Sequence, residues 1–383
     1  MSRIVVFVAA LLAGLAGVRA SDFYAVSPTD LRGPPGTLIR YEGLTNVRLT
    51  DAMAYRILYR STGMRGEPIA VSGMAIVPFA RPPGGESPVV AWAHGTTGIV
   101  PPCAPSLLPK PMKSIVAINE LLGGHFVIAA TDYPGLGAGT MHPYLVGESE
   151  ARAVLDSVRA VRQLDPHAGA RFAVFGHSQG GHAALWTGQV QKRYAPELDL
   201  VGVAALAPAT ELGRLFTDDI HRLSGRILSG LVMESWSDPR IYGAPLDLLI
   251  SRSEQAAFAG IGRECIDIVP DEIDDLRLNK RVPSNFLKVS PTEVEPWRSL
   301  IARNVPPAVR MAAPVYIAQG LADTTVDPPV TANYVARLCR NGSVVSYQTF
   351  PGKTHDTIRK AAARATVEWL RDRFAGRPAP DSC

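Results

Sequence analysis

The chain has 383 residues, of which 46% are hydrophobic and 19% are charged. This composition excludes a disordered or fibrous protein and predicts a globular one, and the length allows either two domains or one large α/β domain with an insertion. The formal net charge is only +4, and the lysines and arginines are scattered singly rather than grouped in basic blocks. Nucleic acid is therefore excluded as an expected partner.

The first twenty residues have the pattern of a signal peptide. Arg3 is followed by an apolar stretch over residues 4–18, and the small residues Val18 and Ala20 occupy the positions that a signal peptidase reads. The apolar stretch is shorter than the ~20 residues that a membrane-spanning helix needs. We therefore expect residues 1–20 to be a signal peptide cleaved after Ala20, and the protein to be secreted or periplasmic.

Export changes the interpretation of the cysteines, because disulfides persist outside the reducing cytosol. The four cysteines are Cys103, Cys265, Cys339 and Cys383. They contain no CxxC pair, which argues against a zinc site. Two disulfides are expected, and the residue pattern leaves all three possible pairings open.

Strand patterns run through most of the chain. Residues 54–78 alternate apolar and polar side chains around a Gly/Pro turn, which predicts an antiparallel hairpin. Continuous apolar runs then span residues 89–93, 126–131, 171–175, 200–206, 314–320 and 343–350. Such runs are typical of strands buried on both faces of a parallel sheet. Amphipathic helices are predicted between several of them, notably over 148–164 and 328–342. The expected fold class is α/β with a mostly parallel, doubly wound sheet.

The alternation of strands and helices breaks off in one long interval. Here the sequence predicts a helical cap at residues 210–307, inserted into a core formed by residues 21–209 and 308–383. Residues 215–236 can form a single helix. The apolar side of that helix would consist of Leu215, Ile220, Leu223, Ile227 and Leu231. This side could cover the site or line an acyl channel, and packing on the sheet is an equal alternative.

The segment GHSQG, residues 176–180, matches the motif G-x-S-x-G. It follows the predicted strand 171–175 and precedes a helical pattern, which is the context of a nucleophile elbow. The two glycines allow a sharp turn without a Cβ clash, so Ser178 is predicted to stand at the C-terminal edge of the sheet as a nucleophile. The main-chain amide of Gln179, at the start of the helix, would face the oxyanion.

A serine hydroxyl needs a base that takes its proton, and the base needs a partner that holds its tautomer. In a fold with this elbow, the acid and then the histidine follow the serine in the chain, each just after a later strand. Asp323 directly follows the apolar run that ends at residue 320, and His355 follows the last run. Order and placement therefore predict a triad of Ser178, Asp323 and His355.

Two other aspartates compete for the place of the acid. Asp356 adjoins His355 in the sequence, so a hydrogen bond to the imidazole ring is awkward. Asp327 lies nearer to the next helix, where an acid commonly serves as a capping residue. Asp323 is preferred over both by its position after the strand.

The second half of an oxyanion hole is predicted in the sequence AHGTTG. His-Gly at 94–95 comes just after a strand, where this class of enzyme places such a donor. The amide of Thr96 is expected to donate there, with Thr97 as the less favoured choice and an ordinary glycine-rich turn as the alternative. His177 and His182 flank the serine without metal-ligand spacing, and we expect them to pack or form hydrogen bonds.

Several of these motifs occur together. They are AWAHGTTG (91–98), CAPS (103–106), TDYPGLG (131–137), HPYLVG (142–147), GHSQGG, GLAD and KTH. As a set they resemble the secretory lipase family, the lipase A-like group of the α/β-hydrolases, over roughly residues 40–372. The resemblance implies a carboxylic ester hydrolase with Ser178, Asp323 and His355 at the triad positions. It also implies a helical lid between the nucleophile strand and the acid strand.

The resemblance also bears on the cysteines and on one loop. It suggests a bridge between Cys103 and Cys265, which leaves Cys339 with Cys383. TDYPGLG is expected to form a loop beside the site, and a turn without ligand contact is an equal alternative.

The predicted protein is an exported serine esterase or lipase. His355 would take the proton of Ser178, and Asp323 would support the imidazolium. The amides of Gln179 and Thr96 would hold the oxyanion until water resolves the acyl-enzyme. The expected partner is an acyl ester or lipid, with transient contact with a lipid surface and the oligomeric state left open, and no metal or cofactor is expected. The alternatives are an acyltransferase with the same triad and a non-catalytic binding protein on the same fold.

Overall fold

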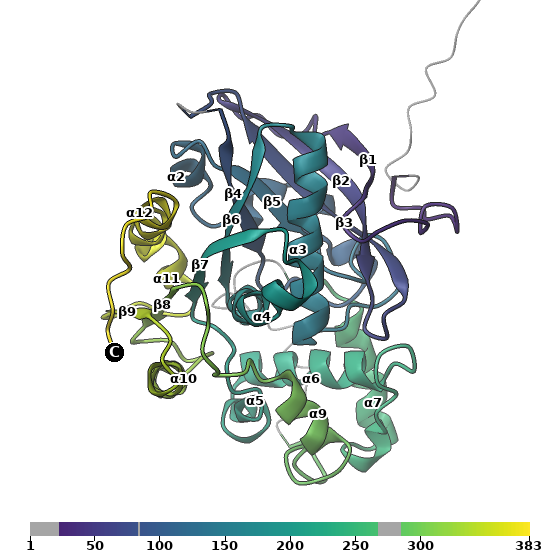
Figure 1. Cartoon of the computed structure of the whole chain (residues 1–383). Coiled ribbons are helices and arrows are strands. Elements are labelled where there is room, and N and C mark those ends of the chain that lie inside the picture. The colour runs from purple at the N-terminus through teal and green to yellow at the C-terminus, as the bar shows by residue number, and fades with distance from the viewer. Residues whose placement is uncertain (1–22, 83–84, 267–284) are drawn as a thin grey trace, which may run out of the picture.

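The computed structural model describes residues 23–82, 85–266 and 285–383, so the predicted signal peptide lies outside the described residues. Nine strands in this part of the chain form one sheet, in the order β1-β2-β3-β5-β4-β6-β7-β8-β9 (Figure 1). Their bounds are β1 Leu38–Gly43, β2 Ala52–Thr62, β3 Pro68–Pro78, β4 Ser87–Ala93, β5 Val127–Thr131, β6 Ala168–His177, β7 Asp199–Leu206, β8 Val315–Gly320 and β9 Val345–Phe350.

The sheet is mixed but largely parallel. Three pairs are antiparallel: β1 with β2, β2 with β3, and β3 with β5. From β5 through β4 to β9 every pair is parallel. The predicted fold class is therefore confirmed, as is the hairpin, and each of the six apolar runs forms a strand. Strand β1 was not predicted, because it lies at the edge of the sheet and its residues are only partly buried or exposed.

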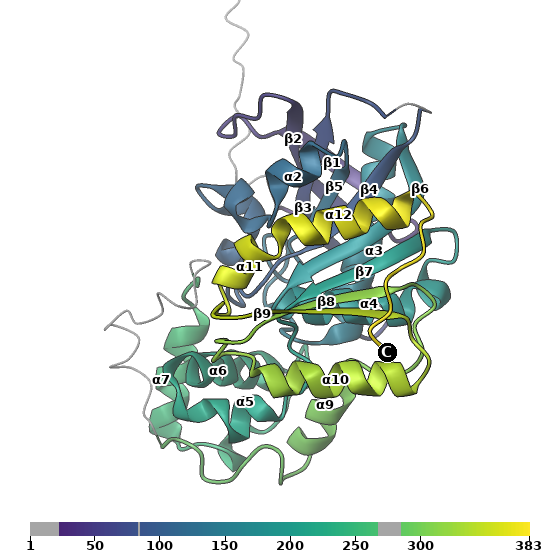
Figure 2. The same ribbon diagram turned by 90° about the vertical axis from the view of Figure 1, so that its left-hand side faces the viewer.

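Helices cover both faces of the sheet, as Figures 1 and 2 show. On one face lie α3 (Gly147–Leu164), α4 (Gln179–Tyr194) and α10 (Pro328–Arg340), and on the other lie α2 (Ile118–Leu122), α11 (Thr357–Ala361) and α12 (Ala363–Phe374). Successive residues of a strand point to opposite faces. Accordingly, Val89 and Ala91 of β4 belong to the first apolar layer, whereas Val90 and Trp92 belong to the second.

The cap, residues 210–307, lies between β7 and β8. Its described elements are α5 (Arg214–Thr217), the 3-10 turns η4 (Asp219–His221) and η5 (Leu246–Leu248), α6 (Leu223–Ser237), α7 (Arg252–Gly262) and α9 (Trp297–Asn304). They enclose an apolar cluster that also includes Ile99 and residues 144–146 of the core, and in which Trp236 and Trp297 are fully buried. Figure 1 shows them gathered at one end of the sheet. The limits of the cap as a domain remain a prediction, and residues 267–284 lie outside the described part.

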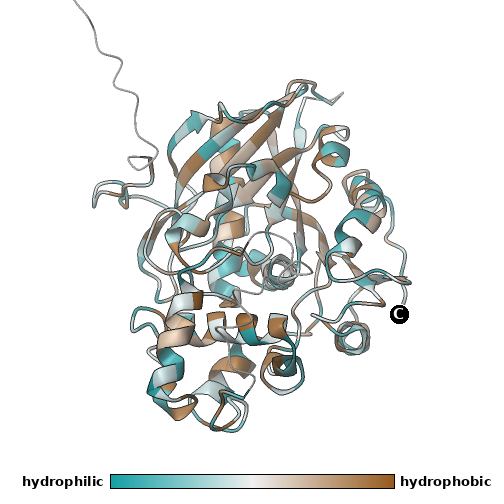
Figure 3. Cartoon of the chain, turned by 180° about the vertical axis from the view of Figure 1, so that it is seen from behind, coloured by the Kyte–Doolittle hydropathy of each residue, from teal (hydrophilic) through white to brown (hydrophobic). Residues whose placement is uncertain are grey.

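The prediction of a single helix over residues 215–236 is wrong. The chain leaves the helical conformation at Arg222, which is extended with φ −100° and ψ 153°. This break lets η4 fold back on the start of α6, where a Cβ on Gly225 would lie 2.0 Å from the main-chain oxygen of Asp219. The apolar side chains still converge, because Ile227 and Leu231 are completely buried in the cap cluster. Figure 3 shows the cap helices with both hydrophobic and hydrophilic turns.

Two disulfides link distant parts of the chain. Cys103 is bonded to Cys265 across 162 residues, and Cys339 is bonded to Cys383 across 44 residues. The resemblance suggested the first bond, and the second joins the two cysteines that remained. Each closes a loop and so restricts the unfolded chain, which is the usual origin of disulfide stabilisation. In the described part of the chain, no helix is long and apolar enough to cross a membrane.

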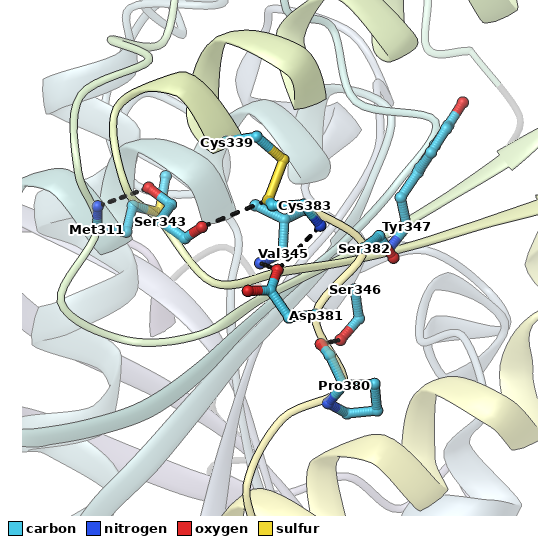
Figure 4. The surroundings of a disulfide bond; sticks show 10 residues. All are labelled: Met311, Cys339, Ser343, Val345, Ser346, Tyr347, Pro380, Asp381, Ser382 and Cys383. Atoms are coloured by element: carbon cyan, nitrogen blue, oxygen red, sulfur yellow. Dashed lines mark hydrogen bonds between the residues drawn. A yellow bond between two sulfur atoms is a disulfide. The ribbon is translucent and has the colours of Figure 1, made fainter.

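The second disulfide holds the C-terminal tail against the edge strand β9 (Figure 4). The amide of Ser382 donates to the main-chain oxygen of Val345 at 2.7 Å, and the amide of Tyr347 donates to Ser382 Oγ at 3.0 Å. Ser346 Oγ donates to the main-chain oxygen of Pro380. The tail therefore occupies hydrogen-bonding groups that an edge strand would otherwise expose.

Candidate active site

The nucleophile elbow is a strained turn between β6 and α4. Ser178 has φ 58° and ψ −120°, a region that costs a non-glycine residue about 1–3 kcal/mol. Gly176 and Gly180 are needed because a side chain at either position would clash with the neighbouring backbone, not because their own φ is positive. A Cβ on Gly176 would lie 2.1 Å from the main-chain oxygen of Gly180, and one on Gly180 would lie 1.9 Å from that of Ala93. The motif therefore packs β4, β6 and α4 closely enough to hold the serine at the edge of the sheet.

The structure brings the three residues of the predicted triad together. His355 Nε2 lies 2.9 Å from Ser178 Oγ, and His355 Nδ1 lies 2.8 Å from Asp323 Oδ2. Asp323 comes three residues after β8 and His355 five residues after β9, so both project from the same edge of the parallel sheet as the serine. These distances are within the hydrogen-bond range required between a nucleophile, its base and the group that orients the base.

The carboxyl group of Asp323 is saturated with donors. Its Oδ1 accepts from the amides of Thr325 and Val326, each at 2.8 Å, and its Oδ2 also accepts from Gln319 Nε2 at 3.0 Å. Burial by itself would raise the pKa of Asp323, but the charge of His355 and these hydrogen bonds lower the pKa below its usual value. Asp323 is therefore an anion placed beside the imidazole.

The two competing aspartates have other contacts. Asp327 faces the cap, where its carboxylate oxygens lie 3.5 Å from Arg222 and 3.9 Å from Arg214. Asp356 occupies the N-cap position of α11. Of the three candidates, Asp323 is the one hydrogen-bonded to Nδ1 of His355.

The predicted oxyanion donors belong to residues near the serine. Gln179 is the first residue of α4, so its amide has no partner within the helix. Thr96 and Thr97 line the same cavity as Ser178. Thr96 Oγ1 is hydrogen-bonded to the hydroxyl of Tyr144 at 2.7 Å. The use of Gln179 and Thr96 as oxyanion donors remains a prediction, with Thr97 still the alternative.

The cavity at Ser178 is narrow and is closed partly by the cap. Its volume is about 30 Å³, room for on the order of two water molecules. From the cap, Ser224, Leu228 and Ile266 line it. Ile266 is fixed next to the Cys103–Cys265 bridge, because its amide donates to the main-chain oxygen of Thr97 at 2.9 Å. The apolar residues predicted to line a channel, such as Ile227, pack inside the cap instead.

Two histidines near the serine have supporting positions. His177 Nε2 lies 2.8 Å from the main-chain oxygen of His355, and burial lowers the pKa of His177 well below its usual value. As a neutral ring it donates to that oxygen and supports the loop of His355, which is the hydrogen-bonding role predicted for it. Burial also lowers the pKa of His94, to about 4, and its ring packs against Tyr133 with 4.4 Å between centroids.

The TDYPGLG loop is tied to the CAPS segment rather than to the cavity. Asp132 accepts from the amide of Ser106 at 2.9 Å, from Ser72 Oγ at 2.7 Å, and also from Ser106 Oγ. None of residues 131–137 lines the cavity at Ser178. The alternative of a turn without ligand contact therefore fits this loop. Its aspartate explains why the two motifs occur together, since one supplies the donors and the other the acceptor.

The sequence did not reveal two polar residues behind the site. Gln319 donates to Asp323 and accepts from Thr331 Oγ1 at 2.7 Å, but it lies inside an apolar strand and carries no motif. Glu150 is completely buried beneath the elbow. It had a detectable signal, because a carboxylate interrupts the apolar stripe of the helix predicted over 148–164. Among the described residues, no cluster of His, Cys, Asp and Glu has an arrangement suited to a metal ion.

The chain has the α/β-hydrolase fold. Its sheet is largely parallel and nine-stranded, and a strained serine between β6 and α4 is hydrogen-bonded to a histidine that follows the last strand. Comparison with protein families gives a match to the secretory lipase family over residues 111–237. This match covers 127 of the 383 residues and confirms the resemblance noted in the sequence.

Known relatives match along most of the chain. A protein of Mycobacterium tuberculosis named as a probable inactive lipase is 24% identical over 383 residues, which covers 91% of this chain and 80% of the relative. A secreted triacylglycerol lipase of Malassezia globosa is 24% identical with the same coverage, 91% and 80%. The X-ray structure of lipase A from Candida antarctica has a TM-score of 0.78 at 18% identity, covering 94% of this chain and 87% of that one. At this identity the structural likeness establishes the fold alone.

Proposed function

We propose that the protein is a serine carboxylic ester hydrolase that cleaves acyl esters through an acyl-enzyme. One observation carries this proposal, the continuous line of hydrogen bonds from Ser178 Oγ at 2.9 Å to His355 and from His355 at 2.8 Å to Asp323. A strained backbone holds the serine, and buried donors hold the aspartate. Such preorganisation is costly for a protein that only binds a ligand, and it is what nucleophilic catalysis requires.

The geometry supports a two-step reaction. Ser178 Oγ attacks the ester carbonyl while His355 Nε2 takes its proton, and Asp323 stabilises the imidazolium through Nδ1. In this mechanism the amides of Gln179 and Thr96 would receive the negative charge on the carbonyl oxygen. His355 then gives its proton to the leaving alcohol. In the second step it activates a water that hydrolyses the acyl-enzyme and regenerates the serine.

Two observations support the proposed substrate class, one from a relative and one from the cavity. The Malassezia relative is named a triacylglycerol lipase, which favours lipid esters and transient contact with a lipid surface. The wall near Ser178 includes the apolar residues Trp92, Leu228 and Ile266, which suits an acyl chain. Secretion or periplasmic location after cleavage behind Ala20 is part of the proposal. Its support is the pair of disulfides and the secreted relative.

The relative named as probably inactive makes a direct test necessary. We would measure hydrolysis of p-nitrophenyl esters of increasing chain length by the wild-type protein and by Ser178→Ala and His355→Ala. Each variant is expected to lower kcat on the scale of ~10⁶, as loss of a nucleophile or its base does in serine hydrolases. Circular dichroism should show that both variants fold. Equal activity in wild type and Ser178→Ala would refute the proposal.

The same assay separates hydrolysis from acyl transfer. Both reactions share the acyl-enzyme and differ only in the nucleophile that resolves it. With added alcohol, a hydrolase releases mainly the free acid, whereas an acyltransferase releases mainly the new ester. Chromatography of the products distinguishes the two, and predominance of the new ester would replace hydrolysis by transfer as the function.

A further inference from the structure

A buried polar cluster lies directly beneath the elbow and is not used by the triad. Its members are Glu150 of α3, His142 of the loop before α3, and Gln179 and His182 of α4, all at most 2% exposed. Burial favours the neutral acid and would raise the pKa of Glu150, but the hydrogen bonds and charge that surround it, those of His182 among them, more than offset burial and lower the pKa below its usual value. Glu150 is therefore a carboxylate inside the core.

The side chain of Gln179 is held by this cluster through both hydrogens of its amide group. Gln179 Nε2 lies 2.7 Å from Glu150 Oε1 and 2.8 Å from His142 Nε2. The carboxylate can only accept, so the group facing it must be the NH₂ of the carboxamide. His142 Nε2 must then accept the other hydrogen. This assignment agrees with the opposite nitrogen, since His142 Nδ1 lies 2.9 Å from the main-chain oxygen of Pro134 and carries the proton.

His182 supplies the opposite charge. Its Nδ1 lies 3.0 Å from Glu150 Oε2, and its Nε2 lies 2.8 Å from the main-chain oxygen of Asn304 in the cap. Both neighbours are acceptors without a hydrogen, so both ring nitrogens must donate. The ring is thus an imidazolium paired with the Glu150 carboxylate. Without it, an unpaired negative charge would lie under the N-terminus of α4 and would oppose an oxyanion at Ser178.

The cluster is connected to the proposed reaction through Gln179, whose side chain it holds. Gln179 directly follows the strained Ser178, and its amide is the donor proposed for the oxyanion. Rotation of that amide would pull the Gln179 side chain away from Glu150 and His142. We infer that Glu150, His142 and His182 are positioning residues that fix the Gln179 side chain and thereby aim its main-chain amide at the oxyanion. This inference rests on the proposed ester hydrolysis.

The test compares Glu150→Gln, Gln179→Met and the double variant. The first replaces the charged acceptor, and the second keeps the length of the side chain but removes both donors. Loss of a whole oxyanion donor costs about 10²–10³ in kcat, so a misaligned amide should lower kcat about 10- to 100-fold. KM should stay within about threefold, because the oxyanion forms only in the transition state. The assay uses p-nitrophenyl butyrate, with active sites counted by a fluorophosphonate probe.

The double variant should be about as slow as the slower single variant, because both changes break the same contact. Asp156→Asn is the matched control. Asp156 is also a fully buried carboxylate on α3, six residues further along, but it accepts from Ser61 Oγ and the hydroxyl of Tyr194, each at 2.7 Å, away from the elbow. Its kcat should stay within about twofold of wild type, whatever happens to its unfolding temperature.

Three results would overturn the inference. They are an unchanged kcat in Gln179→Met, effects that multiply in the double variant, and a Glu150→Gln protein that changes only in unfolding temperature. If Glu150→Gln does not fold, Gln179→Met decides alone. A wild-type protein that hydrolyses no ester, or whose Ser178 the probe does not label, would instead refute the proposed function.

Discussion

Two aspartates four residues apart show how differently the core and the cap are built. Asp323 faces the core, is 3% exposed, and accepts four hydrogen bonds from the histidine, a glutamine and two amides. Asp327 faces the cap, and its contacts are ion pairs with Arg222 at 3.5 Å and Arg214 at 3.9 Å. The side chains of Asp327 and Arg222 are 29% and 45% exposed.

The proposed acid and the attachment of the cap therefore depend on interactions of different strength. Buried hydrogen bonds to a charged group contribute about 1.5–3 kcal/mol each. Exposed ion pairs contribute about 0–1 kcal/mol and weaken with salt. The contact between the cap and Asp327 is therefore expected to be weaker than the hydrogen bonds that hold Asp323. The cavity of about 30 Å³ is far below the usual size of a ligand site.

The largest predicted effect separates the two aspartates. Asp323→Asn should lower kcat by about 10⁴, because an amide at this position no longer holds the imidazole in its productive tautomer. Asp327→Asn should lower kcat less than about threefold, because only exposed ion pairs are lost. Steady-state hydrolysis of p-nitrophenyl butyrate by the two purified variants is the measurement. Equal rates in the two would mean that Asp323 is not the acid.

A smaller effect is expected where the cap meets the acyl chain. Leu228→Asp places a charge in the cavity wall and should reduce kcat/KM about tenfold more for decanoate than for acetate esters, since apolar contact contributes about 0.8 kcal/mol per CH₂. Ile227→Asp is the control, because Ile227 is completely buried in the cap cluster. It should impair folding or reduce activity equally at every chain length. Equal losses for Leu228→Asp would show that this wall does not contact the acyl chain.

The smallest predicted effect concerns Asp219 in the cap. Burial and the nearby charge of Asp327 raise the pKa of Asp219 from 3.8 to about 7. The unfolded chain loses this proton near pH 4, so the carboxyl group costs stability progressively between about pH 4 and 7, and the full cost is present above pH 7. Asp219→Asn should unfold like wild type near pH 4 and about 2–4 °C higher at pH 8.

Differential scanning fluorimetry across this pH range measures the difference. In an Asp327→Asn background the gain at pH 8 should shrink, because one cause of the raised pKa is then absent. A gain of the same size at pH 4 and pH 8 would show that folded Asp219 does not retain its proton.

The placement of the triad could be predicted because it depends on local patterns. Ser178, Asp323 and His355 each follow a strand that is recognisable as an apolar run, and parallel strands end at one edge of a sheet. The order of the strands could not be predicted in the same way, since it is set by long-range pairing that no single run encodes. The two glycines of the elbow were recognised, but the positive φ falls on Ser178 itself.

The parts that were missed depend on contacts between distant segments. Periodicity over residues 215–236 cannot show the break at Arg222, which lets η4 pack back on Gly225. The partners of Gln179 lie 29 and 37 residues away, at Glu150 and His142. A local motif identifies the residue after the nucleophile but not what surrounds its side chain.

The C-terminal tail has a consequence for how the protein behaves in reducing solution. Once the Cys339–Cys383 bond is reduced, hydrogen bonds such as those of Ser382 and the apolar packing of Ala379 are what keep the tail on β9. When the tail leaves β9, the main-chain groups of this edge strand become exposed. They can then pair with a strand of another molecule, such as β9 of a second copy. Turbidity in the presence of a thiol would then signal edge-to-edge assembly of folded molecules. The presence of a thiol in the purification buffer is therefore expected to affect the association of the protein.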